Sequence, residues 1–151
     1  MKVLASNKKA YFDFDVLENV VAGISLYGWE VKSVKANRIS LNGAYVKINS
    51  QEFFLDGASI TPLKYSPAVS KNEEIRQRKL LLTKKQISLL TSSAKQAGNT
   101  IVPLEIIENE KGLVKVNIAL VKGRKKFDKR QKLKEKDVQK QINIKKKKYN
   151  V

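Results

Sequence analysis

Residues 23–48 read GISLYGWEVKSVKANRISLNGAYVKI, and the spacing of their apolar residues changes twice. The segment opens with alternation at Ile24 and Leu26, which is the two-residue period of a half-buried strand. The next positions have helical spacing, because Val31 and Val34 lie three residues apart and share one face of a helix. The segment therefore predicts a strand followed closely by a short helix.

The helix is expected over residues 29–36. Its solvent-facing side or flanks are expected to hold Glu30, Lys32, Ser33 and Lys35. Alternation returns after Asn42-Gly43 and predicts a second strand over 44–48. A strand, a short helix and a returning strand in so few residues are typical of the corner of a compact barrel. The glutamate and lysine side of the helix would lie at the mouth of that barrel.

The composition limits the classes of function. With 151 residues, 42% of them hydrophobic, the chain is long enough for one domain with a core. It lacks cysteine and histidine, which excludes disulfides, thiolate chemistry and the commonest general base and metal ligand. The sequence offers no nucleophile with a suitable base and no glycine-rich phosphate loop. We therefore expect no catalytic residues, no metal and no cofactor.

The cellular location is predicted from the absence of membrane-spanning and signal segments in the sequence. No apolar run approaches the roughly 18 residues that cross a bilayer. The N-terminus has no signal-peptide core. We therefore expect a cytoplasmic protein that has no membrane partner and is a monomer.

The net charge is +17, from 31 basic and 14 acidic residues, and it is uneven along the chain. Residues 1–121 carry 17 basic and 11 acidic residues, a net charge of +6, whereas residues 122–151 carry 14 and 3, a net charge of +11. The chain should thus comprise a folded domain over 1–121 and a basic tail over 122–151. The tail has few apolar residues, so it should be disordered alone, with a helical tendency from residue 131 onward, and should become ordered when phosphates neutralise its charge. Nucleic acid is the usual partner of such charge.

The remaining pattern predicts a mainly β protein. Strands are expected over 11–14, 23–27, 44–48, 52–55, 100–107 and 114–120, and the turn at 49–51 predicts a hairpin between 44–48 and 52–55. Segment 16–23 is ambiguous between strand and helix. Val102, Leu104 and Ile106 are expected on one face, and Pro103 marks an edge or a bulge because it cannot donate a ladder hydrogen bond. About six strands indicate a small, partly open barrel of the oligonucleotide-binding type.

One long helix is expected between Asn72 and Gly98. Asn72 can cap its start, and the acidic pair Glu73-Glu74 suits the positive end of the helix dipole. A core-facing stripe is formed by Leu80, Leu81, Ile87, Leu90 and Ala94. Gly98 is a natural C-terminal stop.

Three blocks of the sequence share motifs with a known family. The first lies within residues 23–48 and includes Glu30-Val31-Lys32-Ser33. The second is Arg76-Gln77-Arg78-Lys79-Leu80-Leu81-Leu82, and the third is Lys122-Gly123-Arg124-Lys125-Lys126-Phe127-Asp128-Lys129-Arg130. In order and spacing these blocks resemble the small protein B family, the SsrA-binding proteins that act with transfer-messenger RNA in the rescue of stalled ribosomes. The resemblance also favours strand for 16–23.

The resemblance implies an oligonucleotide-binding-like barrel with two RNA-directed surfaces. The first would bind the transfer-RNA-like domain of transfer-messenger RNA through Asn7, Lys8, Lys9, Tyr27, Glu30, Lys32, Lys35, Arg38, Arg76 and Arg78. The second is the tail, which would occupy the empty decoding centre and messenger channel of the small ribosomal subunit and become helical on the ribosome. Its contacts would be Lys122, Arg124, Lys125, Lys126, Phe127, Asp128, Lys129, Arg130, Lys132, Lys134 and Lys136. The Glu30 carboxylate would accept hydrogen bonds from RNA, so Glu30→Ala should weaken binding and leave the fold intact.

The sequence departs from the family at two places. Before the second block the family often has a His-Asp-Pro-like segment, and this chain has residues 71–75, Lys-Asn-Glu-Glu-Ile, in its place. Phe127 stands where tyrosine or histidine is more common, which keeps an aromatic face for stacking and loses the polar tip. The difference at 71–75 concerns the geometry of the loop before the second block. The difference at Phe127 concerns the tail.

Other interpretations remain open at this point. Tyr27, Trp29 and Tyr45 can stack on bases or simply pack against the barrel. A basic ribosomal or ribosome-assembly protein would carry the same kind of tail, and an RNA-modifying enzyme could use a similar barrel. RNA selectivity separates the first class from a rescue factor, and catalytic turnover separates the second.

Overall fold

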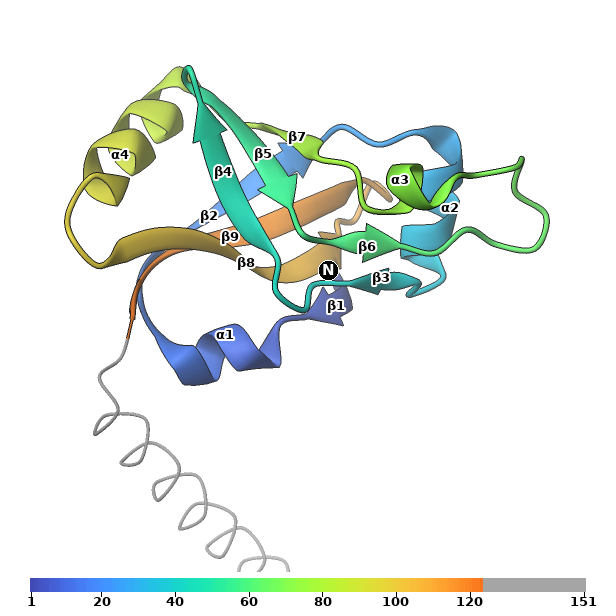
Figure 1. Cartoon of the computed structure of the whole chain (residues 1–151), viewed down its shortest axis with the longest axis horizontal. Helices are drawn as coiled ribbons and strands as arrows, with labels where there is room; N and C mark the ends of the chain where they lie inside the picture. Colours follow the sequence, from blue (N-terminus) through green and yellow to red (C-terminus); the bar gives the residue numbers. More distant parts are fainter. Residues whose placement is uncertain (124–151) are drawn as a thin grey trace, which may run out of the picture.

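Two long strands form the centre of the fold. β8 (Asn99–Glu108) and β9 (Val114–Gly123) are the strands expected from their apolar patterns. They pair antiparallel across a turn in which Gly112 has a φ of 79°, a conformation that favours glycine. The computed structural model of the chain describes residues 1–123, and Figure 1 shows β8 and β9 running through the middle of this part.

The described residues form a seven-stranded antiparallel sheet and a separate two-stranded pair. The order in the large sheet is β1-β8-β9-β2-β7-β5-β4, and the pair is β3-β6. The other strands are β1 (Lys2–Ser6), β2 (Phe14–Ile24), β3 (Ile39–Ser40), β4 (Tyr45–Asn49), β5 (Glu52–Asp56), β6 (Ser59–Ile60) and β7 (Arg78–Leu81). The helices are α1 (Lys8–Asp13), α2 (Gly28–Lys35), α3 (Lys71–Glu74) and α4 (Lys84–Ala94). The mainly β prediction is confirmed. β3 and β6 were not expected, because two residues are too few to show a period.

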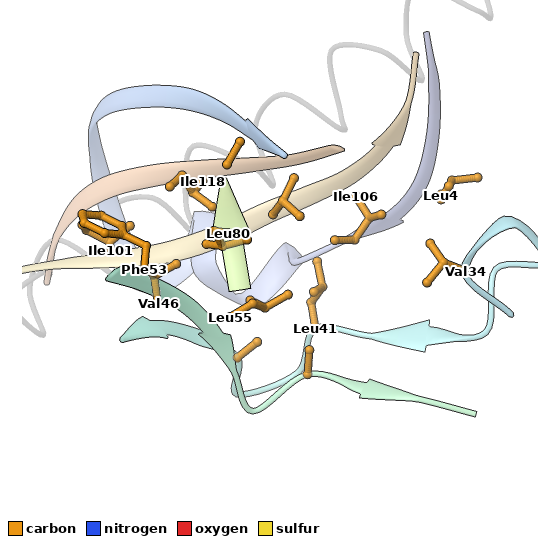
Figure 2. Packing of buried hydrophobic residues seen from close by; sticks show 14 of the residues in the cluster. Leu4, Val34, Leu41, Val46, Phe53, Leu55, Leu80, Ile101, Ile106 and Ile118 are labelled. Atoms are coloured by element: carbon orange, nitrogen blue, oxygen red, sulfur yellow. The ribbon is translucent and has the colours of Figure 1, made fainter. Parts of the chain in front are cut away.

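The large sheet curves so that its two halves face each other. β4 is the last strand in the sheet order, and it lies against β8, which is the second strand from the other end. Figure 2 shows side chains from both halves pointing into the space between them, among them Leu55, Leu80, Ile106 and Ile118. Each of these four is at most 3% exposed. Their burial supplies the main favourable free energy for closing the barrel.

A bulge at Pro103 changes which side chains of β8 face this core. The register of β8 against β9 shifts just after Pro103, as expected for a residue that cannot donate to the ladder. Ile101 and Ile106 lie in the main cluster, whereas Val102 and Leu104 pack in a second cluster with residues of α1 and β9. The prediction that Val102, Leu104 and Ile106 share one face is wrong, because the extra residue shifts the alternation by one.

The predicted hairpin is formed by β4 and β5. Asn49 pairs with Glu52, which leaves Ser50 and Gln51 as a two-residue loop. Both loop residues have positive φ, 48° and 67°, as a type I′ turn requires. This turn joins the edge strand to β5, which in turn pairs with β7.

Residues 8–13 form α1 and are not the start of a strand, so the expectation for 11–14 is wrong. The Asn7 side chain caps α1 by accepting from the Ala10 N–H at 3.3 Å. The same side chain donates from Nδ2 to the Pro103 carbonyl at 2.9 Å, which ties the helix to β8. β2 begins at Phe14, so the ambiguous segment 16–23 is strand.

The long helix expected between residues 72 and 98 is also wrong. The segment contains α3, β7 and α4 in succession. Leu80 of β7 pairs with Ile24 on β2 and with Phe53 on β5, which are contacts distant in sequence. Thr83 and Gln86 then form a capping box that starts α4 as a new helix. Within residues 1–123, no helix has the length and apolar character needed to span a bilayer.

Candidate functional site

Glu30 is fully buried in the first turn of α2. Its Oε1 accepts from the Tyr27 N–H at 2.7 Å, which satisfies a backbone donor at the start of the helix. Two arginines that are distant in sequence also donate to this carboxylate. Arg76 Nη2 donates to Oε1, and Arg78 Nε donates to Oε2 at 2.9 Å. The carboxylate thus joins the start of α2 to the segment that leads into β7.

Arg78 is also fully buried and connects several elements at once. Its Nη1 donates to the Ala58 carbonyl at 2.9 Å. Its Nη2 donates to the carbonyls of Glu73 at 3.2 Å and Glu74 at 2.9 Å. Burial lowers the pKa of the Arg78 guanidinium, and the hydrogen bond with Glu30 opposes that shift. One arginine therefore holds α2, α3 and the approach to β6 in place.

Arg76 forms the solvent-facing part of this network. Its Cζ lies 4.0 Å from the centre of the Tyr27 ring, a cation–π distance. The Arg76 side chain is 24% exposed and Tyr27 is 56% exposed. Because the buried Glu30 holds Arg76, the ring and the cation form a fixed surface feature, which we call the Tyr27–Arg76 platform. An exposed ring beside a cation can stack on a base and attract the phosphate next to it.

Three of the predicted RNA-binding residues are buried rather than exposed. Asn7 is 5% exposed, and Glu30 and Arg78 are 0% exposed. The side chains of these residues are covered by the rest of the fold. The expectation that Glu30 lies on the solvent side of its helix is therefore wrong. The reason is the pairing with Arg76 and Arg78, which face the first turn of α2.

Two local signals are consistent with the burial of these side chains, although they do not reveal which residues pair. Glu30 stands three residues after the N-cap Tyr27, which is the capping-box spacing. Arg78 and Leu80 stand two residues apart, and that is the strand period that turns both side chains inward.

Apart from the partly exposed Arg76 of the platform, the other predicted residues of the folded part are exposed and lie in two places. Those on or beside α2 are Tyr27, Lys32, Lys35 and Arg38. Lys35 Nζ is 3.5 Å from Glu108 Oε1, so part of its charge is compensated. Lys8 and Lys9 lie on α1, which is well separated from α2 in Figure 1. The structure thus groups the platform with the α2 lysines and leaves the α1 lysines apart.

Most of the predicted tail lies outside the described residues. This applies to Arg124, Lys125, Lys126, Phe127, Asp128, Lys129, Arg130, Lys132, Lys134 and Lys136. Lys122 is within the described part, where it is an exposed residue of β9 opposite Asp15 on β2. The sheet therefore continues through Lys122 to Gly123.

Trp29 and Tyr45 have different surroundings. Tyr45 is 46% exposed, and its hydroxyl donates to Asp56 Oδ2 on the paired strand at 3.0 Å. Trp29 is half-buried and packs against the main core. It also lines a cavity beside α2 together with Tyr65. Trp29 therefore both packs against the core and lines an open cavity.

The Glu30 network predicts that stability depends on acidity. Burial raises the pKa of Glu30, but the hydrogen bonds from Arg76, the Tyr27 N–H and Arg78 outweigh burial, so its pKa lies below the ordinary value of 4.5. A carboxyl with a lowered pKa in the folded state stabilises the fold fully above its unfolded pKa and loses that effect as the pH falls through the folded value. We expect the free energy of unfolding to decrease progressively below about pH 4.5.

Denaturant unfolding at a series of pH values measures this effect. The variant Glu30→Gln should show a flatter pH dependence than the parent in the acidic range. An identical dependence in the two proteins would mean that Glu30 does not couple proton binding to folding.

Comparison with known proteins identifies the family. A family model described as SmpB protein matches residues 4–148, which is most of the chain. The SsrA-binding protein of Helicobacter pylori strain J99 is 46% identical over 142 residues, covering 94% of this chain and 93% of the relative. The SsrA-binding protein of Alkalilimnicola ehrlichii is 46% identical over 139 residues, covering 92% of this chain and 86% of the relative.

The fold agrees with the same family. One similar chain comes from a solved structure described as "tmRNA-SmpB: a journey to the center of the bacterial ribosome". It superimposes with a TM-score of 0.66 at 35% sequence identity, over 81% of this chain and 85% of the other. The family model, the curated relatives and the fold agree over most of the length, and the chain belongs to the SmpB protein family.

Proposed function

We propose that this protein binds transfer-messenger RNA and acts with it on the ribosome in trans-translation. The observation that carries the proposal is the 46% identity with an SsrA-binding protein over 142 residues, which leaves few residues of either chain unmatched. The similarity to a chain of the solved tmRNA-SmpB structure agrees with it. Since ribosomes work in the cytoplasm, we place the protein there.

The folded part is proposed to bind the transfer-RNA-like domain through the side chains that are exposed around α2. The Tyr27–Arg76 platform supplies a ring for stacking and a cation for a phosphate. Lys32, Lys35 and Arg38 add positive charge beside it. Glu30 and Arg78 act from within, because they hold the platform and the ends of α2, α3 and β6 in one geometry.

The basic segment after the folded part is proposed to act on the ribosome. Its net charge suits ribosomal RNA, and Phe127, an aromatic residue within a basic run, can stack on a base. In this division of roles the folded part selects the RNA and the tail occupies the empty decoding centre. The protein itself makes and breaks no covalent bond.

Selective RNA binding is the experiment that tests the proposal. The affinity of the full chain for transfer-messenger RNA should be compared with that for an elongator transfer RNA, at a low and at a physiological salt concentration. Both salts are needed because a protein of net charge +17 binds any RNA when screening is weak. A preference for transfer-messenger RNA that persists at the higher salt is the expected result. Equal affinities that fall together would identify a generic basic ribosomal protein instead.

The platform makes a separate prediction. Tyr27→Ala should weaken binding to transfer-messenger RNA by about 5- to 150-fold, since stacking on one base contributes about 1–3 kcal/mol. Tyr27→Phe keeps the ring and should bind within a few-fold of the parent. The measurement is a titration at physiological salt. If the alanine and phenylalanine variants bind equally well, Tyr27 does not stack on the RNA.

A further inference from the structure

A cavity of about 440 Å³ lies between the first turns of α2 and the loop that follows β6. Its walls include Trp29 and Lys32 from the helix, and Leu63, Tyr65 and Pro67 from the loop. In Figure 1 this loop extends past α3 at the same end of the molecule as α2. The volume falls within the roughly 300–1,000 Å³ that is usual for sites that hold small molecules. Neither Tyr27 nor Arg76 lines it, so the cavity is separate from the Tyr27–Arg76 platform.

The cavity walls are aromatic and apolar, and a cation lies at the site. Tyr65 is 95% exposed, so its ring gains almost nothing from packing within the folded part. Lys32 is exposed and forms no ion pair with any residue of 1–123. A ligand that complements this lining is flat and unsaturated and carries a negative charge at one end.

Trp29 and Tyr65 give the cavity aromatic walls. The indole Nε1 of Trp29 is buried and has no partner among the residues that the structure describes, so the N–H is not what Trp29 offers to a ligand. A nucleobase can stack on aromatic side chains of this kind whatever its sequence identity. An aliphatic ligand such as an acyl chain would gain no such stacking.

We propose that this cavity binds one unpaired nucleotide of the RNA partner, with the base between Trp29 and Tyr65 and its phosphate at Lys32. The inference rests on the proposed function, because it takes the ligand to be part of the RNA that the folded part selects. It also adds a second base contact, made by residues other than Tyr27 and Arg76. A nucleotide held there adds specificity for an RNA with an unpaired residue at that position.

The chain suits a direct test because Trp29 is its only tryptophan. Unlabelled transfer-messenger RNA is titrated into the full chain while the tryptophan emission is recorded, and binding is followed in parallel by filter retention. Stacking of a base on the indole should quench the emission with the same midpoint as binding. Full binding without any change in emission would overturn the proposal.

Variants of Tyr65 separate stacking from other effects of nearby RNA. Tyr65→Ala should lose about 5- to 150-fold in affinity and most of the quenching, whereas Tyr65→Phe should keep both, because it keeps the ring. The exposure of Tyr65 means that neither change should disturb folding. Equal affinity and equal quenching in the alanine and phenylalanine variants would overturn the assignment.

Failure of this site can be distinguished from failure of the proposed function. If the parent protein prefers transfer-messenger RNA at physiological salt but Tyr65→Ala has no effect, only the cavity assignment is overturned. If the parent shows no preference, the proposed function is overturned, and quenching that depends on Tyr65 then supports a nucleotide site for RNA in general.

Discussion

Glu30→Ala is expected to lower the free energy of unfolding by about 3–5 kcal/mol, because removing one partner of a buried ion pair leaves the other charge uncompensated. The uncompensated group would be Arg78, which is 0% exposed and bonded to Glu30 at 2.9 Å. The helix start would lose an acceptor as well, since the Tyr27 N–H donates to the same carboxylate. Denaturant unfolding at neutral pH measures the loss. The result would reverse the sequence-based expectation that this change leaves the fold intact.

A matched control exists in the large sheet, between β5 and β7. Glu52 also pairs with a cation, Lys79, at 3.6 Å, but the two side chains are 55% and 50% exposed. Exposed ion pairs contribute about 0–1 kcal/mol, so Glu52→Ala should change stability little. If the two alanine variants lost the same small amount, the buried network would not stabilise the fold as described.

The effect of Glu30→Ala on RNA binding should follow from the fold. Loss of the carboxylate releases Arg76 from its position over the Tyr27 ring. Binding to transfer-messenger RNA should therefore weaken even under conditions in which the variant remains folded. Binding by folded Glu30→Ala at parental affinity would show that the platform needs no support from the buried carboxylate.

Removal of residues 124–151 is expected to abolish tagging on stalled ribosomes and to preserve selective binding of transfer-messenger RNA. Residues 1–123 contain two hydrophobic clusters and the Glu30 network, so we expect the truncated chain to keep a core. The measurements are a tagging assay with stalled ribosomes and an RNA titration at physiological salt. Tagging by the truncated protein would contradict the proposed division of roles.

The control for this experiment keeps the charge and changes the order. A chain with the same tail residues in shuffled sequence retains the net charge but places Phe127 and its neighbours elsewhere. It should bind transfer-messenger RNA like the parent and fail to support tagging, because charge alone does not position an aromatic ring. Full tagging by the shuffled chain would mean that the tail acts only through its charge.

Several elements could be predicted from the sequence because their signals are local. The alternation in β9, the hairpin turn between β4 and β5, and the helical spacing of Val31 and Val34 depend on neighbours in the chain. The motifs that indicated the family are also short, contiguous blocks. Local periodicity and turn chemistry were sufficient for these features, since no distant partner is needed to produce them.

The tertiary structure decided the features that depend on distant partners. The run at Leu80 suits a helix or a strand, and pairing with Ile24 and Phe53 selects the strand. Glu30 has the composition of a surface residue, yet its partners stand 46 and 48 positions away, and only folding brings them together. A charged side chain is buried when opposite charges and hydrogen-bond donors replace its water, and their positions are set by the whole fold rather than by adjacent residues.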